Sequence, residues 1–119
     1  MERRVNIRTT NVQHELAELA RSPSQRVRHL LKVIFEKIQE NPAAYPEIDE
    51  VPEDIDSILL ELGGVLRKAP LVHQKHDYRL IYLHWKEANR AFVEFQFIFQ
   101  RRAGYERIDW DLLSKRLGG

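Results

Sequence analysis

The fold is decided by the run Tyr78-Arg79-Leu80-Ile81-Tyr82-Leu83-His84-Trp85 and by the run Phe92-Val93-Glu94-Phe95-Gln96-Phe97-Ile98-Phe99-Gln100. Both are rich in aromatic and branched residues, and their alternation is typical of strands. Alternation in the first run places Tyr78, Leu80, Tyr82 and His84 on one face and Arg79, Ile81, Leu83 and Trp85 on the other. In the second run it places Val93, Phe95, Phe97 and Phe99 on one face and Glu94, Gln96, Ile98 and Gln100 opposite. Residues 86–90 are predicted to form a hairpin turn, so the two strands form the centre of the sheet.

The rest of the chain predicts shorter elements around this sheet. A first strand contains Val5 and Ile7, and two helices follow, the first to about Ala20 and the second from the Ser22-Pro23 signal to Asn41-Pro42. A short helix is expected over 52–62, ended by Gly63-Gly64, and then an edge strand over 65–72 that contains Pro70. Asp109 is the expected N-cap of a last helix. The fold class is therefore α+β: a small antiparallel sheet of about four strands, an N-terminal helical hairpin and a C-terminal helix. We expect the helices to cover one sheet face and leave the other open for a ligand.

Length and composition limit what the chain can be. Its 119 residues suit one domain, 1–119, with 43% hydrophobic and 31% charged content. It has no cysteine, and its histidines are scattered, so we expect neither a metal site nor a cofactor. It has no signal core and no apolar run approaching the roughly 20 residues of a membrane helix, so a cytoplasmic location is expected.

Charge is unevenly distributed along the chain, although the formal net charge is +1. Residues 40–61 contain many carboxylates and no Lys or Arg, whereas residues 66–106 are net positive. The positive part predicts a surface that attracts phosphate. Two solvated surfaces of opposite charge are the simpler interpretation, and we favour a solubilising role for the acidic segment.

The last third of the chain carries a family resemblance. The order of elements, the Tyr78–Tyr82 strand and the exit Arg101-Arg102-x-x-Tyr105 resemble the RelE/ParE superfamily of toxins, and most closely its HigB-like branch. The elbow Tyr105-Glu106-Arg107-Ile108-Asp109 is similar to the polar elbow of that branch. By layout the resemblance covers nearly the whole chain, although its specific residues lie in the last third.

The resemblance implies a RelE-like fold and a type II toxin-antitoxin toxin that cleaves mRNA on the ribosome. It implies a cognate antitoxin, the ribosome and mRNA as partners. Cleavage in the family uses no metal, since the 2′-hydroxyl of the RNA attacks the adjacent phosphate. Some members instead inhibit DNA gyrase.

This reaction needs cations beside the phosphate and groups that transfer protons. Arginine pairs with two phosphate oxygens and stays charged, and Tyr105 lies where the family keeps a tyrosine. The expected catalytic residues are Arg79, Arg101, Arg102, Tyr105 and His76. The expected RNA-binding residues are Arg67, Lys68, His73 and Lys75.

Each of these residues also has an ordinary structural interpretation. Arg79 could pair with Asp77 or Glu94, Tyr105 could anchor the last helix, and a histidine near a turn could face solvent. The chain also departs from the family, because Arg102 replaces a histidine and Pro70 and Val72 occupy positions of lysines. Two alternatives therefore remain: a non-catalytic module on the same fold, such as a gyrase inhibitor or a regulatory protein, and a general nucleic-acid-binding domain.

Overall fold

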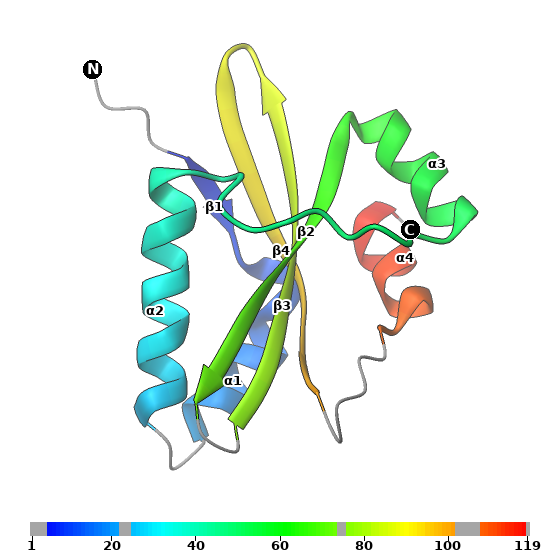
Figure 1. The fold of residues 1–119 in the computed structure, drawn as a ribbon. Helices are drawn as coiled ribbons and strands as arrows, with labels where there is room; N and C mark the ends of the chain where they lie inside the picture. Colours follow the sequence, from blue (N-terminus) through cyan, green and yellow to red (C-terminus); the bar gives the residue numbers. More distant parts are fainter. Residues whose placement is uncertain (1–4, 22–24, 74–75, 102–107, 119) are drawn as a thin grey trace.

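A computed structural model of the chain describes residues 5–21, 25–73, 76–101 and 108–118. The side chains of Ala20, His73 and His76 also lie outside this description. The elements follow the order β1 (Asn6–Arg8), η1 (Thr10–Val12), α1 (Gln13–Arg21), α2 (Gln25–Glu40), α3 (Glu53–Leu62), β2 (Gly64–His73), β3 (His76–Glu87), β4 (Arg90–Gln100) and α4 (Trp110–Gly118). The predicted α+β class is confirmed, with a four-stranded sheet, an N-terminal pair of helices and a C-terminal helix (Figure 1).

The sheet has the strand order β1-β4-β3-β2. β2, β3 and β4 form an antiparallel meander, as expected, whereas β1 pairs with β4 in parallel. The β3–β4 hairpin closes through Ala88 and Asn89, both at positive φ, 49° and 67°. Such a two-residue turn matches the right-handed twist of the strands it joins. The turn predicted over 86–90 is therefore confirmed, in a tighter form.

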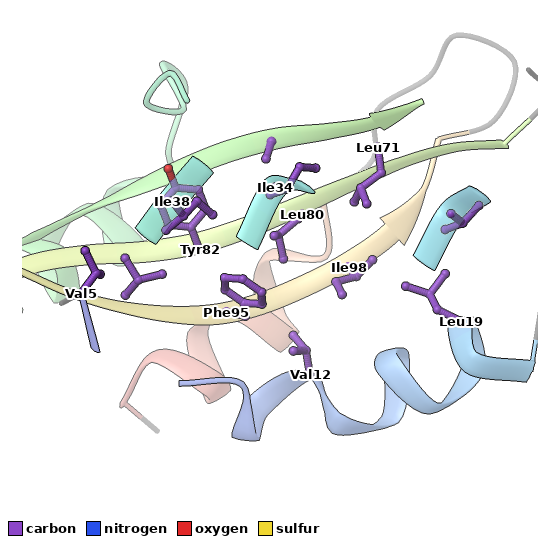
Figure 2. Close-up of a cluster of buried hydrophobic side chains, with 13 residues drawn as sticks. Val5, Val12, Leu19, Ile34, Ile38, Leu71, Leu80, Tyr82, Phe95 and Ile98 are labelled. Atoms are coloured by element: carbon purple, nitrogen blue, oxygen red, sulfur yellow. The ribbon is translucent and has the colours of Figure 1, made fainter. Parts of the chain in front are cut away.

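One sheet face is covered by the N-terminal helices. Val12, Leu19, Val27, Ile34 and Ile38 pack against Leu71, Leu80, Tyr82, Val93 and Phe95. Figure 2 shows this core, with the α2 residues Ile34 and Ile38 above the sheet residues Leu80 and Tyr82. The apolar stripe of α2 repeats at helical spacing, so it buries one side of this helix.

The other face is covered too, which corrects the expectation that it stays open. Ile55 and Leu59 of α3 and Leu113 and Leu117 of α4 pack on this second face. They cover the strand residues Leu66, Ile81 and Leu83, which are buried. Trp85, Phe97 and Phe99 are partly buried against the same cluster. Each strand of the meander therefore carries apolar side chains on both faces. Figure 1 shows α3 and α4 on the opposite side of the sheet from α1 and α2.

A β-bulge in β4 overturns the predicted faces of that strand. The β3–β4 register passes from Tyr82 opposite Phe95 to Ile81 opposite Phe97, so Gln96 has no partner across the ladder. An extra residue shifts all later side chains to the other face. Phe97 and Phe99 therefore lie on the second face, whereas Ile98 joins the core that contains Phe95.

Helix ends follow the local sequence. α3 ends at Gly63, which adopts a left-handed conformation with φ of 69° and donates its N–H to the last turn of the helix. At the start of α4, Oδ1 of Asp109 accepts a hydrogen bond of 3.1 Å from the N–H of Leu112, as its predicted N-cap role requires. The Ser22-Pro23 start signal of α2 lies outside the described residues.

Candidate functional site

The candidate site lies at the end of the sheet from which the chain leaves toward residues 102–107. Asp77 and Arg79 begin β3, and Arg101 follows β4. The backbone N–H of Arg101 donates to the carbonyl of Asp77 at 2.7 Å, which places the two residues opposite each other. Asp77 and Arg79 are two residues apart in one strand, so their side chains share a face. That face is the second one, because Arg79 pairs across the ladder with Phe99.

Asp77 joins the two arginines. Nη1 of Arg79 forms an ion pair and a hydrogen bond with Oδ1 of Asp77, and Nη1 of Arg101 lies 3.9 Å from Oδ2. Arg79 also donates to the carbonyl of Tyr78 at 3.1 Å. The interpretation of Arg79 as an ion-pair partner of Asp77 therefore holds in this structure.

Burial distinguishes the two arginines. The side chain of Arg79 is 10% exposed, whereas those of Asp77 and Arg101 are 30% and 32% exposed. A carboxylate that bridges two guanidinium groups stabilises positive charge in a partly desolvated place. Counting these three side chains alone, the group carries one net positive charge. Arg101 is the more accessible to a ligand.

The two consecutive basic residues of β2 point to opposite faces. Lys68 pairs with Ile81 and so lies on the face of Arg79, whereas Arg67 pairs with Tyr82 on the face of α2. Of the predicted RNA-binding pair, Lys68 is thus on the same face as the candidate site and Arg67 is not. Of the remaining predicted residues, Lys75, Arg102 and Tyr105 lie outside the described part, as do the side chains of His73 and His76.

Arg67 instead belongs to a second polar cluster that the sequence did not reveal. Its Nε donates to Nδ1 of His84 at 3.2 Å, and its Nη1 donates to the carbonyl of Tyr45 at 2.9 Å. Since Nδ1 of His84 accepts this bond, the ring is neutral and its proton is on Nε2. Nε2 is buried and has no hydrogen-bond partner among the described residues. Burial, and then the charges of Arg67 and Lys86, lower the pKa of His84.

The same cluster fastens the segment after α2 to the sheet. The Tyr82 hydroxyl donates to the carbonyl of Pro42 at 2.7 Å, and burial raises the pKa of Tyr82 to about 12. The strand alternation placed Tyr82 and His84 on one face, but nothing local signalled that a segment some forty residues earlier would reach them. His84 is a structural group here and does not lie on the face of Arg79.

A cavity of about 550 Å³ lies at the start of α4. Among the described residues it is lined by Ile108, Asp109, Trp110 and Asp111. Neither Arg79 nor Arg101 belongs to that lining, so the cavity and the arginine pair are separate features of the described surface. In the described part of the chain, His, Asp and Glu side chains form no cluster that could hold a metal ion.

Comparisons with protein-family models, with curated proteins and with solved structures found no match to this chain. Within the described ranges, every helix is too short or too polar to cross a membrane.

Proposed function

We propose that this chain is a type II toxin of the RelE/ParE superfamily, in its HigB-like branch, and that it binds and cleaves mRNA on the ribosome. The chain runs through a short strand, two helices, the short helix α3, a three-stranded meander and a C-terminal helix, and this order is part of the resemblance. The proposed partners are a cognate antitoxin, the ribosome and mRNA, and the proposed location is the cytoplasm.

The observation that carries the proposal is the convergence of Arg79 and Arg101 on Asp77. The start of β3 and the residue after β4 bring guanidinium groups to one end of a sheet. Arginine pairs with two phosphate oxygens at once, and partial burial strengthens its interaction with an anion. Lys68 adds a further cation on the same face.

The proposed reaction is attack of the 2′-hydroxyl of the RNA on its own adjacent phosphate. The new oxygen–phosphorus bond closes a 2′,3′-cyclic phosphate, and the bond from phosphorus to the 5′-oxygen of the next nucleotide breaks. A base takes the proton of the 2′-hydroxyl, and an acid gives one to the departing 5′-oxygen. Arg101, supported by Arg79, would stabilise the negative charge that grows on the phosphorus oxygens. Proton transfer would fall to His76 and Tyr105, with Arg102 as a further cation.

Expression without any antitoxin tests the proposal. We expect growth arrest together with cuts in translated mRNA, and we expect Arg101→Gln to weaken both. Arg21→Gln is the matched control, because the side chain of Arg21 is 79% exposed on α1. Normal growth with intact transcripts would contradict the proposal.

A second candidate is a non-catalytic module on the same fold, such as a gyrase inhibitor or a regulatory protein. It is favoured by the burial of Arg79, whose side chain is 10% exposed and paired with Asp77 as a structural arginine would be. It predicts that purified protein leaves mRNA intact on ribosomes and that Arg102→Ala does not change any toxicity. Supercoiling by purified gyrase, with and without the protein, separates gyrase inhibition from a regulatory role.

A further inference from the structure

A groove of about 360 Å³ lies between α3, the start of β2 and the segment before α3. Its apolar lining includes Ile48, Leu60 and Val65, and its acidic lining consists of Glu47, Asp49 and Asp56. The volume falls in the lower part of the range of roughly 300 to 1,000 Å³ that is common for ligand sites. The groove is remote in sequence from the arginine pair and has no part in the proposed RNA site.

Leu60 is the notable apolar side chain of this groove. It is 77% exposed, although it lies in a helix whose Ile55 and Leu59 are buried in the core. Asp56 lies four residues before Leu60, so a carboxylate and an exposed leucine share one face of α3. A single exposed leucine needs no explanation by itself. Here the exposed leucine lies beside carboxylates in a groove of mixed apolar and acidic lining, so a partner must match both properties to cover it.

The groove is held in shape by backbone hydrogen bonds. The N–H of Ile48 donates to the carbonyl of Leu66 at 3.0 Å, and the N–H of Lys68 donates to the carbonyl of Pro46 at 3.1 Å. These bonds join the segment before α3 to the edge of β2, and the Gly63 cap fixes the end of α3. A surface that is already ordered loses little conformational entropy on binding.

The negative charge of the groove indicates which kind of partner would bind there. The carboxylates of the groove belong to residues 40–61, which contain no Lys or Arg, and the bridge between Glu47 and Arg67 of β2 leaves Asp49 and Asp56 as its acidic border. Such a surface repels phosphate and attracts cations. An amphipathic segment with apolar side chains on one side and Lys or Arg beside them complements both properties of the groove.

We propose that this groove binds a basic amphipathic helix of a partner protein. An apolar side chain of the partner lies against Leu60, and its Lys or Arg side chains contact Asp49 and Asp56, whereas Glu47 lies opposite Arg67 of β2. This proposal is independent of the proposed toxin function.

The test uses the full chain and two synthetic helical peptides of about four turns. Both peptides carry leucines along one face, and the remaining positions are lysine in one peptide and glutamate in the other. Fluorescence anisotropy measures binding. We expect the lysine peptide to bind more weakly as salt rises, and the glutamate peptide not to bind.

Variants then locate the peptide. Leu60→Gln should weaken binding roughly tenfold, because the apolar contact is lost. The double change Asp49→Asn/Asp56→Asn should weaken it roughly three- to tenfold. Glu36→Gln on α2 is the matched control, since it removes an exposed carboxylate away from the groove and should leave affinity unchanged. Since Leu60, Asp49 and Asp56 are exposed, unchanged unfolding temperatures should show that the variants fold.

Three results would overturn the proposal. They are no binding of the lysine peptide at about 1 mM, equal binding of the two peptides, and binding that the groove variants leave unchanged. Sedimentation of the chain alone supplies a fourth: a dimer that Leu60→Gln dissociates would assign the groove to a second copy of this chain.

Discussion

Glu15 of α1 and Arg116 of α4 form a two-pronged ion pair, although they lie 101 positions apart in the chain. Nη1 of Arg116 lies 2.6 Å from Oε2 of Glu15, and Nη2 lies 3.0 Å from Oε1. The same Nη1 donates to the carbonyl of Gln96 at 2.7 Å, in the bulge of β4. Asn11 contributes from η1, donating to the carbonyl of Arg116 at 3.2 Å and to Oε1 of Gln96 at 3.1 Å. This network links η1 and α1 to α4, and links η1 and α4 to the bulge of β4 at Gln96.

We expect Arg116→Gln to destabilise the protein by about 2 to 4 kcal/mol, because it leaves the carboxylate of Glu15 without its cation in a mostly buried place. The side chains of Glu15 and Arg116 are 14% and 19% exposed. Arg21→Gln should cost less than about 1 kcal/mol, because the Arg21–Glu18 pair is exposed. Urea denaturation measures both changes. Similar losses in the two variants would contradict a special role for the buried pair.

His84 predicts a loss of stability at mildly acidic pH. Its pKa in the folded chain is lowered from the ordinary 6.5 by burial and then by Arg67 and Lys86, and the charge of Glu47 opposes this shift. Below pH 6.5 the unfolded chain therefore takes up a proton that the folded chain does not yet bind. The free energy of unfolding falls as the pH drops from 6.5 toward the lowered pKa.

His84→Gln should flatten this part of the curve, because glutamine does not titrate. The control is His14→Gln, since the side chain of His14 is 83% exposed. Urea denaturation at several pH values between about 7 and 5 measures the difference. If the wild type and His84→Gln lose stability in parallel over this range, another group is responsible.

Substitution of Gly63 should change stability only through the backbone conformation. Its φ is 69°, and a Cβ at this position would meet no atom within 4 Å. Gly63→Ala should therefore cost about 1 kcal/mol through the left-handed backbone, and Gly63→Asn should cost less. Gly118→Ala is the control, because its added Cβ would make an ordinary contact of 4.0 Å with Ile58. Thermal unfolding compares the variants, and an unchanged Tm for Gly63→Ala would refute this explanation.

A substitution of Asp77 tests how charge at the candidate site affects RNA binding. Asp77→Asn removes the carboxylate that contacts both Arg79 and Arg101, so a phosphate meets less competition for the guanidinium groups. If the chain binds RNA as proposed, affinity for a single-stranded RNA should rise roughly threefold at low salt, with a steeper dependence on salt.

Asp54→Asn, an exposed change in α3, removes the same charge away from the site. Fluorescence anisotropy, at temperatures where each variant is folded, measures the affinities. If RNA affinity rises equally in both variants, the cause is the change in net charge and not the position of Asp77. If RNA affinity falls in Asp77→Asn, the Asp77 carboxylate supports RNA binding.

Much of the fold follows from local chemistry. The alternation of residues 78–85 predicted both faces of β3, and Gly63 and Asp109 predicted the end of α3 and the start of α4. The faces of β4 after Gln96 were predicted wrongly, because the chain inserts one residue relative to β3 and no turn residue marks the place. Of the candidate site, the sequence indicated Arg79 and Arg101, but not that one carboxylate joins them.

The sequence by itself determined the α+β class, the order of the elements and the caps at Gly63 and Asp109, because periodicity, capping and turn propensity act between residues close in the chain. The tertiary structure alone decided the rest: helices on both sheet faces, the parallel pairing of β1, the buried state of Arg79 and the Arg67–His84 contact. Each of these depends on which distant segments meet when the core closes. Burial and pairing set the charge state and accessibility of a side chain, so they decide which arginine can meet a ligand.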